Sequence, residues 1–377
     1  MIYLDCAAAT PLDSSVEAAM RPYWQEKFYN PSANYLAGRA VAADITAARA
    51  TVAQQLGVKP SEVIFTDGGA ESDNLAIHGV MQAYPGANLL VSAVEHEAVL
   101  QTAQAYAHRV VPVDTRGLID LDALARQIDE KTVLVSVMYA NNEIGTIQPI
   151  RQIADIIKQV LAKRQAAGNT HPLYFHTDAS QAANYLDIHA NRLGVDLMTL
   201  NGGKMYGPKQ TGVLFVRAGL VLQPQVRGGG QERGLRSGTE NVAGIIGFAK
   251  ALETTQKLRN DETKRLRGLQ TMFVKQLKTA VPNVIINGGK SQLPNIVHVT
   301  IPNCDNERVM MQLDEQGIIC AVGSACSASN EEPSHVLTAI GLSDVEAQGS
   351  LRFSLGRQTT QKDIETTVQA LQKIIAA

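Results

Sequence analysis

The sequence predicts a large α/β domain with a mainly parallel sheet, followed by a smaller α+β domain. Three observations lead to this fold class. Short apolar runs alternate with longer amphipathic stretches in the first part of the chain, as in a parallel sheet covered by helices. After about residue 240 this alternation gives way to one long helical stretch and fewer elements. The chain has 377 residues, too many for one core of ordinary size, so two domains are expected.

The elements of the large domain follow in chain order. Apolar residues at helical spacing indicate a helix that Gly57 could end; they are Val41, Ile45, Ala48, Val52 and Leu56. A second amphipathic helix is expected over residues 150–167. Apolar strands are expected at residues 63–65, 89–94, 133–139, 173–177, 197–200 and 212–216.

The small domain is expected to follow a long helical stretch over residues 242–281, either as one helix or as two with a break between them. Its further elements are strands at residues 295–301 and 350–355 and helices at residues 307–316 and 360–376. We expect the boundary near residue 255. Residues 13–255 then form the large domain, and residues 1–12 and 256–377 form the small one. The assignment of residues 1–12 rests on the resemblance described below.

Composition and charge exclude several classes of protein. Lys and Arg total 34 against 36 for Asp and Glu, a net charge of −2, so direct nucleic-acid binding is not expected as the main task. Mean hydropathy is −0.06 and no apolar run reaches the length of a membrane span. The N-terminus lacks the basic and apolar regions of a signal peptide. We therefore expect a cytoplasmic enzyme that does not bind a membrane.

A glycine-rich segment follows the first expected strand. Residues 66–71 read TDGGAE, and an apolar helical pattern begins after them. Free N–H groups at the start of such a helix attract an anion such as phosphate. The alternative is an ordinary glycine turn with a polar cap. The nucleotide-binding patterns GxGxxG and GxxxxGK[ST] are absent from this segment.

Three further polar residues follow expected strands, so all should meet at one edge of the sheet. Asp178 either holds a protonated ring nitrogen or caps the next helix. His96 either stacks on a flat ring or shuttles a proton, unless it is a helix-start histidine with a satisfied hydrogen bond. Lys204, after two glycines, either forms a Schiff base with an aldehyde or is a solvated loop lysine.

Two other side chains carry open alternatives. Asn142 follows the strand at residues 133–139 and brings an amide to the same sheet edge. Arg352 lies on the strand at residues 350–355, where its charge needs a partner. That partner is either a substrate carboxylate or a structural salt bridge.

The four cysteines form neither a disulfide framework nor a CxxC pair, as expected for a reducing compartment. Cys326 stands among small residues, GSACSAS, and is expected to lie accessible on a loop. Its reactivity would require a thiolate favoured by nearby positive charge. Cys6, Cys304 and Cys320 are interpreted as buried structural cysteines.

At these motifs the chain resembles the cysteine desulfurases of the NifS/IscS type, a branch of the class V aminotransferase family with PLP fold type I. The resemblance runs from residues 3–11, YLDCAAATP, to residues 352–357, RFSLGR. The matching segments between them are NPS at residues 30–32, NNEIGT at 141–146, GGGQERG at 228–234, RSGT at 236–239, GSAC at 323–326 and PSHVL at 333–337. Each segment is weak alone, but together they are specific.

The resemblance implies a pyridoxal 5'-phosphate enzyme that converts L-cysteine to L-alanine and keeps the sulfur as a persulfide on Cys326. The sulfur then passes to an acceptor protein, either a scaffold for iron–sulfur cluster assembly or a tRNA-thiolation enzyme. Thr239 resembles a phosphate ligand donated by the other subunit, which implies a homodimer with shared active sites.

The resemblance also implies roles for the residues at the sheet edge. Lys204 resembles the Schiff-base lysine, Asp178 the partner of the pyridine nitrogen, and His96 the residue stacked on the ring. Gln181 and Asn142 resemble contacts to the phenolic oxygen of the ring or to the substrate, and Asn142 is expected to bind both. Arg352 resembles the clamp for the carboxylate of L-cysteine.

The expected phosphate site departs from the family pattern. Ala70 stands where the family usually has Thr, and Asn201 and Gly203 stand where it has Ser and His. We expect backbone N–H groups near Gly69, the amide of Asn201 and the side chain of Thr239 to hold the phosphate instead. Cys6 replaces a residue that is usually aromatic or polar, and no role is assigned to it.

Two alternatives compete with the desulfurase interpretation. A related lyase acting on selenocysteine or cysteine need not use Cys326, whereas persulfide transfer must. A sulfur-carrier scaffold with weakened cofactor chemistry is suggested by the altered phosphate site. Such a protein would lack the visible absorbance band of the lysine-linked cofactor.

Overall fold

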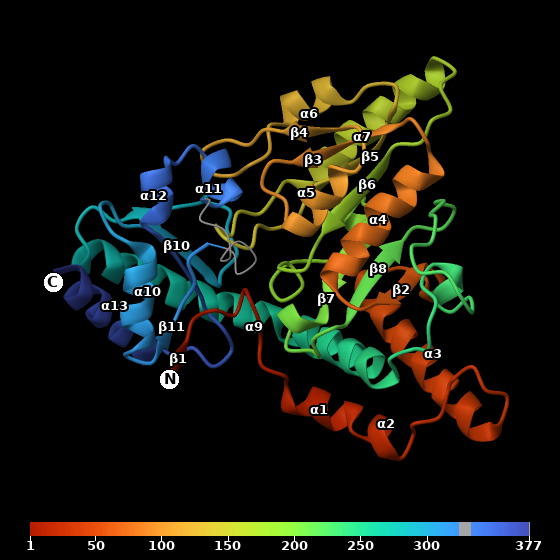
Figure 1. Ribbon diagram of the computed structural model, residues 1–377, viewed down its shortest axis with the longest axis horizontal. Helices are drawn as coiled ribbons and strands as arrows, with labels where there is room; N and C mark the ends of the chain where they lie inside the picture. Colours follow the sequence, from red (N-terminus) through yellow and green to blue (C-terminus); the bar gives the residue numbers. More distant parts are fainter. Residues whose placement is uncertain (324–332, 377) are drawn as a thin grey trace.

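The structure, a computed structural model, describes residues 1–323 and 333–376 (Figure 1). Within these residues, a seven-stranded sheet of order β2-β8-β7-β6-β5-β3-β4 forms the centre of the larger part. Its strands are β2 (Val63–Thr66), β3 (Asn88–Ser92), β4 (His108–Val111), β5 (Thr132–Ser136), β6 (Tyr174–Asp178), β7 (Leu197–Asn201) and β8 (Gly212–Val216). Strand β8 runs antiparallel to both of its neighbours, whereas β7, β6, β5, β3 and β4 form a parallel series.

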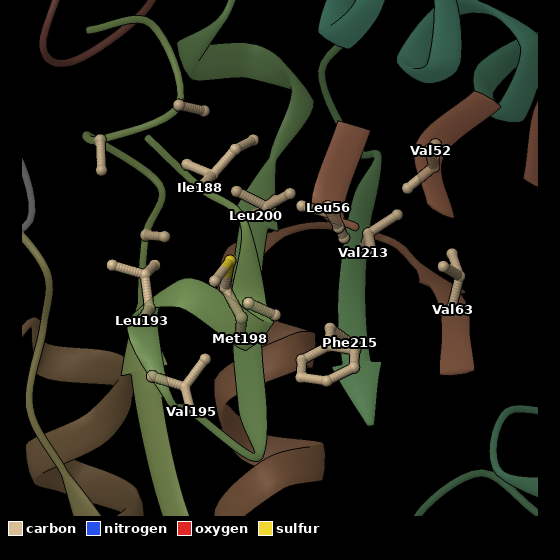
Figure 2. Close-up of a cluster of buried hydrophobic side chains, with 14 of the residues drawn as sticks. Val52, Leu56, Val63, Ile188, Leu193, Val195, Met198, Leu200, Val213 and Phe215 are labelled. Atoms are coloured by element: carbon tan, nitrogen blue, oxygen red, sulfur yellow. The ribbon is translucent and has the colours of Figure 1, made fainter. Parts of the chain in front are cut away.

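Helices cover both faces of this sheet because its strands are apolar on both sides. On β8, Val213 and Phe215 belong to one buried cluster and Leu214 and Val216 to another on the opposite face. Figure 2 shows part of the first cluster, where Leu56 packs near β8. The helices of this part are α1 (Ser14–Met20), α2 (Pro22–Gln25), α3 (Leu36–Leu56), α4 (Gly69–Ala83), α5 (Glu97–Ala103), α6 (Leu121–Gln127), α7 (Ile150–Ala166) and α8 (Ala190–Leu193), with 3-10 turns η1 (Pro60–Glu62), η2 (Gly202–Lys204) and η3 (Glu232–Gly234).

Helix α9 (Val242–Ala280) links the large sheet to the C-terminal part as one continuous helix. Phe248 and Leu252 near its start belong to the core beside the large sheet, whereas Phe273 and Leu277 belong to the second core. The helix therefore passes the expected boundary near residue 255 without a break, and the division into two domains stays a prediction.

A smaller antiparallel sheet of order β12-β10-β9 lies in the C-terminal part (Figure 1). Its strands are β9 (Ile285–Ile286), β10 (Ile296–Thr300) and β12 (Ser350–Ser354), with helices α10 (Asn306–Asp314), α11 (His335–Ala339), α12 (Asp344–Gln348) and α13 (Gln361–Ala376). The N-terminus joins it: β1 (Ile2–Tyr3) pairs in parallel with β11 (Ile318–Ile319), and Asp5 bridges to Ser354. This pairing brings residues at the two ends of the sequence together.

The expected elements are largely present, with differences at their ends. Gly57 ends α3 in the left-handed conformation at φ 64°, as predicted. The strand expected at residues 133–139 ends at Ser136, although Val137 and Tyr139 still donate backbone hydrogen bonds to β6. Strand β4 was not predicted, because the sequence HRVV offers too short an apolar run. None of the described helices is long and apolar enough to span a membrane.

Candidate active site

A cavity of about 210 Å³ lies at the carboxyl ends of β2, β3, β5, β6 and β7. This is the position at which open α/β sheets bind ligands. The N-terminal segment and β12 close its other side. The cavity is lined by Ala7, Ala8, Gly69, Ala70, Asp73, His96, Met138, Ala140, Asn142, Asp178, Ser180, Gln181, Asn201, Lys204 and Arg352.

Most of the residues singled out from the sequence meet in this cavity. Those that line it are Gly69, Ala70, His96, Asn142, Asp178, Gln181, Asn201, Lys204 and Arg352. Gly203 is buried behind Asn201 and Thr239 is exposed between η3 and α9, so neither lines the cavity. Cys326 lies outside the described residues. The roles assigned to all these residues stay predictions.

Asp178 forms the polar floor of the cavity at the end of β6. One carboxylate oxygen accepts the backbone N–H of Ser180 at 2.8 Å, so Asp178 does cap the turn that follows. The same carboxyl lines the cavity, where it can also hold a positively charged ring nitrogen. The two interpretations drawn from the sequence are therefore compatible in one side chain.

Two more carboxyl groups and an imidazole lie buried around Asp178. Burial raises the pKa of Asp73 well above its ordinary value, and the nearby Asp178 charge adds to the effect. Burial likewise raises the pKa of Glu95, whose second carboxyl oxygen has no hydrogen-bond partner in the described structure. His176 bonds the hydroxyls of Ser136 and Thr199, and burial lowers its pKa to about 4. Burial therefore favours the neutral forms of the groups around Asp178.

The start of α4 forms a cradle for an anion. A Cβ placed on Gly69 would come within 3.2 Å of Asn201 Nδ2 and 3.3 Å of Ser180 Oγ. Asn201 Oδ1 accepts the N–H of Gly203 at 3.0 Å, so the amide N–H groups remain on the side of α4. Backbone N–H groups of the first turn of α4 add to these donors. The donor set suits a phosphate despite the Ala at position 70.

Lys204 comes to the cavity from the 3-10 turn η2, directly after β7. Its Nζ donates to the carbonyl of Ala8 at 2.5 Å, and its own carbonyl accepts a hydrogen bond from Asn184 at 2.6 Å. The side chain is therefore oriented along the cavity wall and does not extend into solvent as an ordinary loop lysine would. Its amine is placed for attack on an aldehyde bound between Asp178 and the cradle.

Arg352 is almost completely buried in β12 and carries an ion pair. Its Nη2 donates to Asp5 at 2.7 Å, and Nη1 donates to the carbonyl of Asn142 at 3.1 Å. Its Nε has no hydrogen-bond partner in the described part of the chain. The side chain thus forms the structural salt bridge that the sequence left open, and it lines the cavity as well.

His96 and Gln181 are held by local contacts at the cavity wall. His96 is the N-cap of α5, and its Nδ1 accepts the N–H of Ala98 at 3.1 Å. In a neutral ring, Nε2 then carries the proton. Gln181 donates to the carbonyl of Ala7 at 2.9 Å, which ties the N-terminal segment to the turn after β6.

The described cysteines have little nucleophilic character. Burial raises the pKa of Cys6 and of Cys320 to about 12, and it also raises that of Cys304. A thiol with a raised pKa forms little of the reactive thiolate near neutral pH. The interpretation of these three residues as structural cysteines fits their surroundings.

The residues present fit pyridoxal 5'-phosphate. The cavity offers an amine for its aldehyde in Lys204, a carboxylate for its ring nitrogen in Asp178, and a cradle at Gly69 for its phosphate. These groups arise from three different strand ends, so the fold assembles them from distant parts of the sequence.

Several lining residues were not singled out from the sequence. Asp73 and Ser180 stand within three positions of the candidates Ala70 and Asp178, so this short spacing was the available signal. Ala7 and Ala8 contribute backbone carbonyls, which leave no trace in residue type. Met138 and Ala140 contribute apolar wall surface.

Comparisons of sequence agree with this geometry. The family described as Aminotransferase class-V matches residues 2–367. The chain is 41% identical to the cysteine desulfurase IscS of Dictyoglomus turgidum, covering 99% of this chain and 94% of the relative. It is 39% identical to the cysteine desulfurase IscS of Methanosarcina thermophila, covering 99% of this chain and 92% of that relative.

Solved structures show the same fold. A NifS-like protein matches with a TM-score of 0.91 at 32% identity, over 100% of this chain and 99% of the other. SspA, solved in complex with cysteine, matches with a TM-score of 0.82 at 34% identity, over 94% and 99%. The chain therefore belongs to the aminotransferase class-V family, in its group of NifS/IscS-like cysteine desulfurases.

Proposed function

We propose that this protein is a pyridoxal 5'-phosphate-dependent cysteine desulfurase, which converts L-cysteine to L-alanine and takes the sulfur as a persulfide on Cys326. One observation carries the proposal: Lys204 and Asp178 line the same cavity, from the ends of the adjacent strands β7 and β6, beside an anion cradle. The relatives named cysteine desulfurase and the SspA complex with cysteine support this substrate.

When bound, the cofactor would withdraw electrons from the bonds at the α-carbon of the substrate. Lys204 would hold its aldehyde and would move protons at the α-carbon. Asp178 would keep a proton on the ring nitrogen. His96 would pack against the ring, and the cradle at Gly69 with the amide of Asn201 would hold the phosphate.

The carboxylate of L-cysteine binds at Arg352, since that arginine is buried and its guanidinium group contributes positive charge to the cavity lining. Gln181 and Asn142 orient the ring oxygen and the substrate. Asp5 keeps the guanidinium in place through the 2.7 Å ion pair.

Sulfur transfer needs a nucleophile that the described cysteines do not supply, because burial raises their pKa values. The thiolate of Cys326 attacks the substrate sulfur. An S–S bond forms, the C–S bond of the substrate breaks, and a proton completes L-alanine. The persulfide on Cys326 then passes its outer sulfur to an acceptor protein, a scaffold for iron–sulfur clusters or a tRNA-thiolation enzyme.

A homodimer and a cytoplasmic location complete the proposal. Thr239 is exposed. A residue that reaches the phosphate site of a second copy of the chain has to be exposed on its own subunit. The free thiols of Cys6, Cys304 and Cys320 suit a reducing compartment such as the cytoplasm.

The test is a product balance with purified, cofactor-loaded protein. L-cysteine is expected to give one alanine for each persulfide sulfur released by a reductant. Cys326→Ser should keep the visible absorbance of the bound cofactor but lose persulfide formation and sulfur release. Alanine and sulfide production by Cys326→Ser at the normal rate would favour a lyase, and failure to bind cofactor would favour a scaffold.

A further inference from the structure

Residues 333–337, PSHVL, have no part in the proposed reaction, yet the start of α11 contacts the cavity wall. His335 Nε2 lies 2.9 Å from the carbonyl oxygen of Glu95, and its Nδ1 lies 3.2 Å from a carboxylate oxygen of Glu97. These two residues flank His96, which lines the cavity. A histidine from the C-terminal part therefore contacts both neighbours of a cavity residue.

The chemistry of these contacts defines what the ring donates. A backbone carbonyl only accepts hydrogen bonds, so Nε2 of His335 carries the proton that it donates to the carbonyl of Glu95. The carboxylate of Glu97 lies 3.2 Å from Nδ1, on the other side of the ring.

The contact with Glu95 acts directly on the backbone of His96. The carbonyl of Glu95 and the N–H of His96 belong to one rigid peptide plane, so a hydrogen bond to the carbonyl fixes the chain entering His96. The N-cap contact from Ala98 to His96 Nδ1 at 3.1 Å fixes the ring from the other side. Together the two contacts restrict where the imidazole of His96 lies.

Ser334 provides a second anchor at the same place. Its hydroxyl donates to Glu143 Oε2 at 2.7 Å, and Glu143 is buried directly after Asn142. The carbonyl of Asn142 in turn accepts a hydrogen bond from Arg352. Two consecutive residues of the C-terminal part thus hold the two wall segments that carry His96 and Asn142.

We propose that His335 is a positioning residue that acts through His96, with Ser334 as its second anchor. This inference rests on the proposed function, in which His96 covers the cofactor ring. His335 does not touch the reacting atoms. Its task is to hold the 95–97 segment so that the His96 ring keeps one orientation over the cofactor.

A double-mutant cycle tests whether His335 acts through His96. His335→Ala is expected to lower kcat roughly tenfold, about the scale of one lost hydrogen bond, with little change in KM. In a His96→Ala background, the same substitution should have no further effect. His335→Gln keeps an amide with two N–H donors and is expected to recover most of the activity.

The control is His78→Ala, because His78 also makes a side-chain contact, 2.7 Å from the hydroxyl of Tyr106, on α4 away from the cavity lining. It should leave kcat unchanged. Amide exchange gives a readout without turnover: residues 94–100 should exchange faster in His335→Ala, and at the normal rate in His78→Ala.

The role of His335 would be overturned if the losses in kcat caused by His335→Ala and His96→Ala multiply in the double variant. Amide exchange at the normal rate over residues 94–100 of His335→Ala would overturn it as well. The exchange experiment does not depend on the reaction. A wild-type protein that makes no alanine, but whose 94–100 segment loosens in His335→Ala, would refute the proposed function and leave the anchoring intact.

Discussion

The floor and the rim of the cavity are built in different ways. The floor comprises Asp178 and the buried residues around it, Asp73, Glu95 and His176, at the ends of strands and the start of helices. The rim comprises Asp5, Ala8, Arg352 and the Ser334–His335 pair. Floor contacts such as that of His176 with Ser136 join residues 40 positions apart, whereas Arg352 and Asp5 are 347 positions apart.

This difference indicates that the floor and the rim have different tasks in the site. The floor residues are buried at the edge of the sheet, so the floor suits a cofactor that must remain bound in one orientation. The rim is built from contacts between the N-terminus, the C-terminal part and the large sheet, so it depends on how these parts pack together. Substitutions in the two regions should therefore fail in different ways.

The largest expected effect is on the floor side, at the lysine. Lys204→Ala should reduce desulfuration by about a thousandfold or more, because it removes both the covalent attachment and the proton carrier. Lys209→Ala, an exposed lysine of the same turn region, is the matched control and should behave like wild type. Steady-state alanine formation measures both. Near-normal turnover by Lys204→Ala would remove the amine from the reaction.

The next effect is on the rim. Asp5→Asn leaves the buried Arg352 without its charged partner, so unfolding in urea should show a loss of about 3–5 kcal/mol. KM for L-cysteine should also rise, because the guanidinium is no longer held in place. Asp13→Asn, which breaks the more exposed 2.9 Å ion pair with Arg357 outside the cavity lining, is the control. Asp13→Asn should lose less free energy of unfolding and should leave KM for L-cysteine unchanged. Equal KM values in Asp5→Asn and Asp13→Asn would contradict a role of Asp5 in the rim.

A smaller effect is expected in the phosphate cradle. Asn201→Ala removes an amide beside Gly69, and a lost hydrogen bond to a charged group should speed cofactor dissociation roughly tenfold or more. Asn191→Ala also loses a side-chain hydrogen bond, to the carbonyl of Gly57 at 2.9 Å, but lies elsewhere. Dialysis followed by absorbance measures cofactor retention. Unchanged retention in Asn201→Ala would exclude Asn201 from the phosphate site.

The smallest expected effect is on the way in which the free energy of unfolding depends on pH through the buried carboxyl of Glu95. Since burial raises the pKa of Glu95, the folded protein binds its proton more tightly than the unfolded chain does. Stability from this group is therefore fully present below the ordinary pKa of about 4.5 and is lost as the pH rises above it. Glu95→Gln, which mimics the neutral acid and keeps the acceptor for Met138 N–H, should be more stable relative to wild type at pH 8 than at pH 4.

Thermal unfolding at both pH values, with exposed Glu253→Gln as the control, measures this difference. A wild-type advantage over Glu95→Gln that grows with pH would mean that Glu95 is ionised in the folded protein.

Of the floor residues, Asp178 could be predicted from the sequence, as could Lys204 and His96 at the cavity wall. Each of the three stands at or shortly after the end of an apolar strand, and parallel strand ends converge at one edge. The cradle was partly predicted in the same way. Burial of Asp73 and Glu95 was not predicted, because charged residues in a glycine-rich turn or after a strand are usually solvated.

The rim could not be predicted from local pattern. The hydrogen bonds from Lys204 to Ala8 and from Gln181 to Ala7 end on backbone carbonyls, which every residue type carries. The ion pair of Arg352 with Asp5 depends on the parallel pairing of β1 with β11, two strands of two residues each. Such short strands carry no periodicity from which their partner could be inferred.

The most direct test of the central claim is to find the covalent site of the cofactor. Borohydride reduction of the loaded wild-type protein, followed by proteolysis and mass spectrometry, should place the pyridoxyl phosphate mass on the peptide carrying Lys204. Finding that mass on Lys209 or another lysine, or finding none after full loading, would contradict a cavity built around the amine of Lys204.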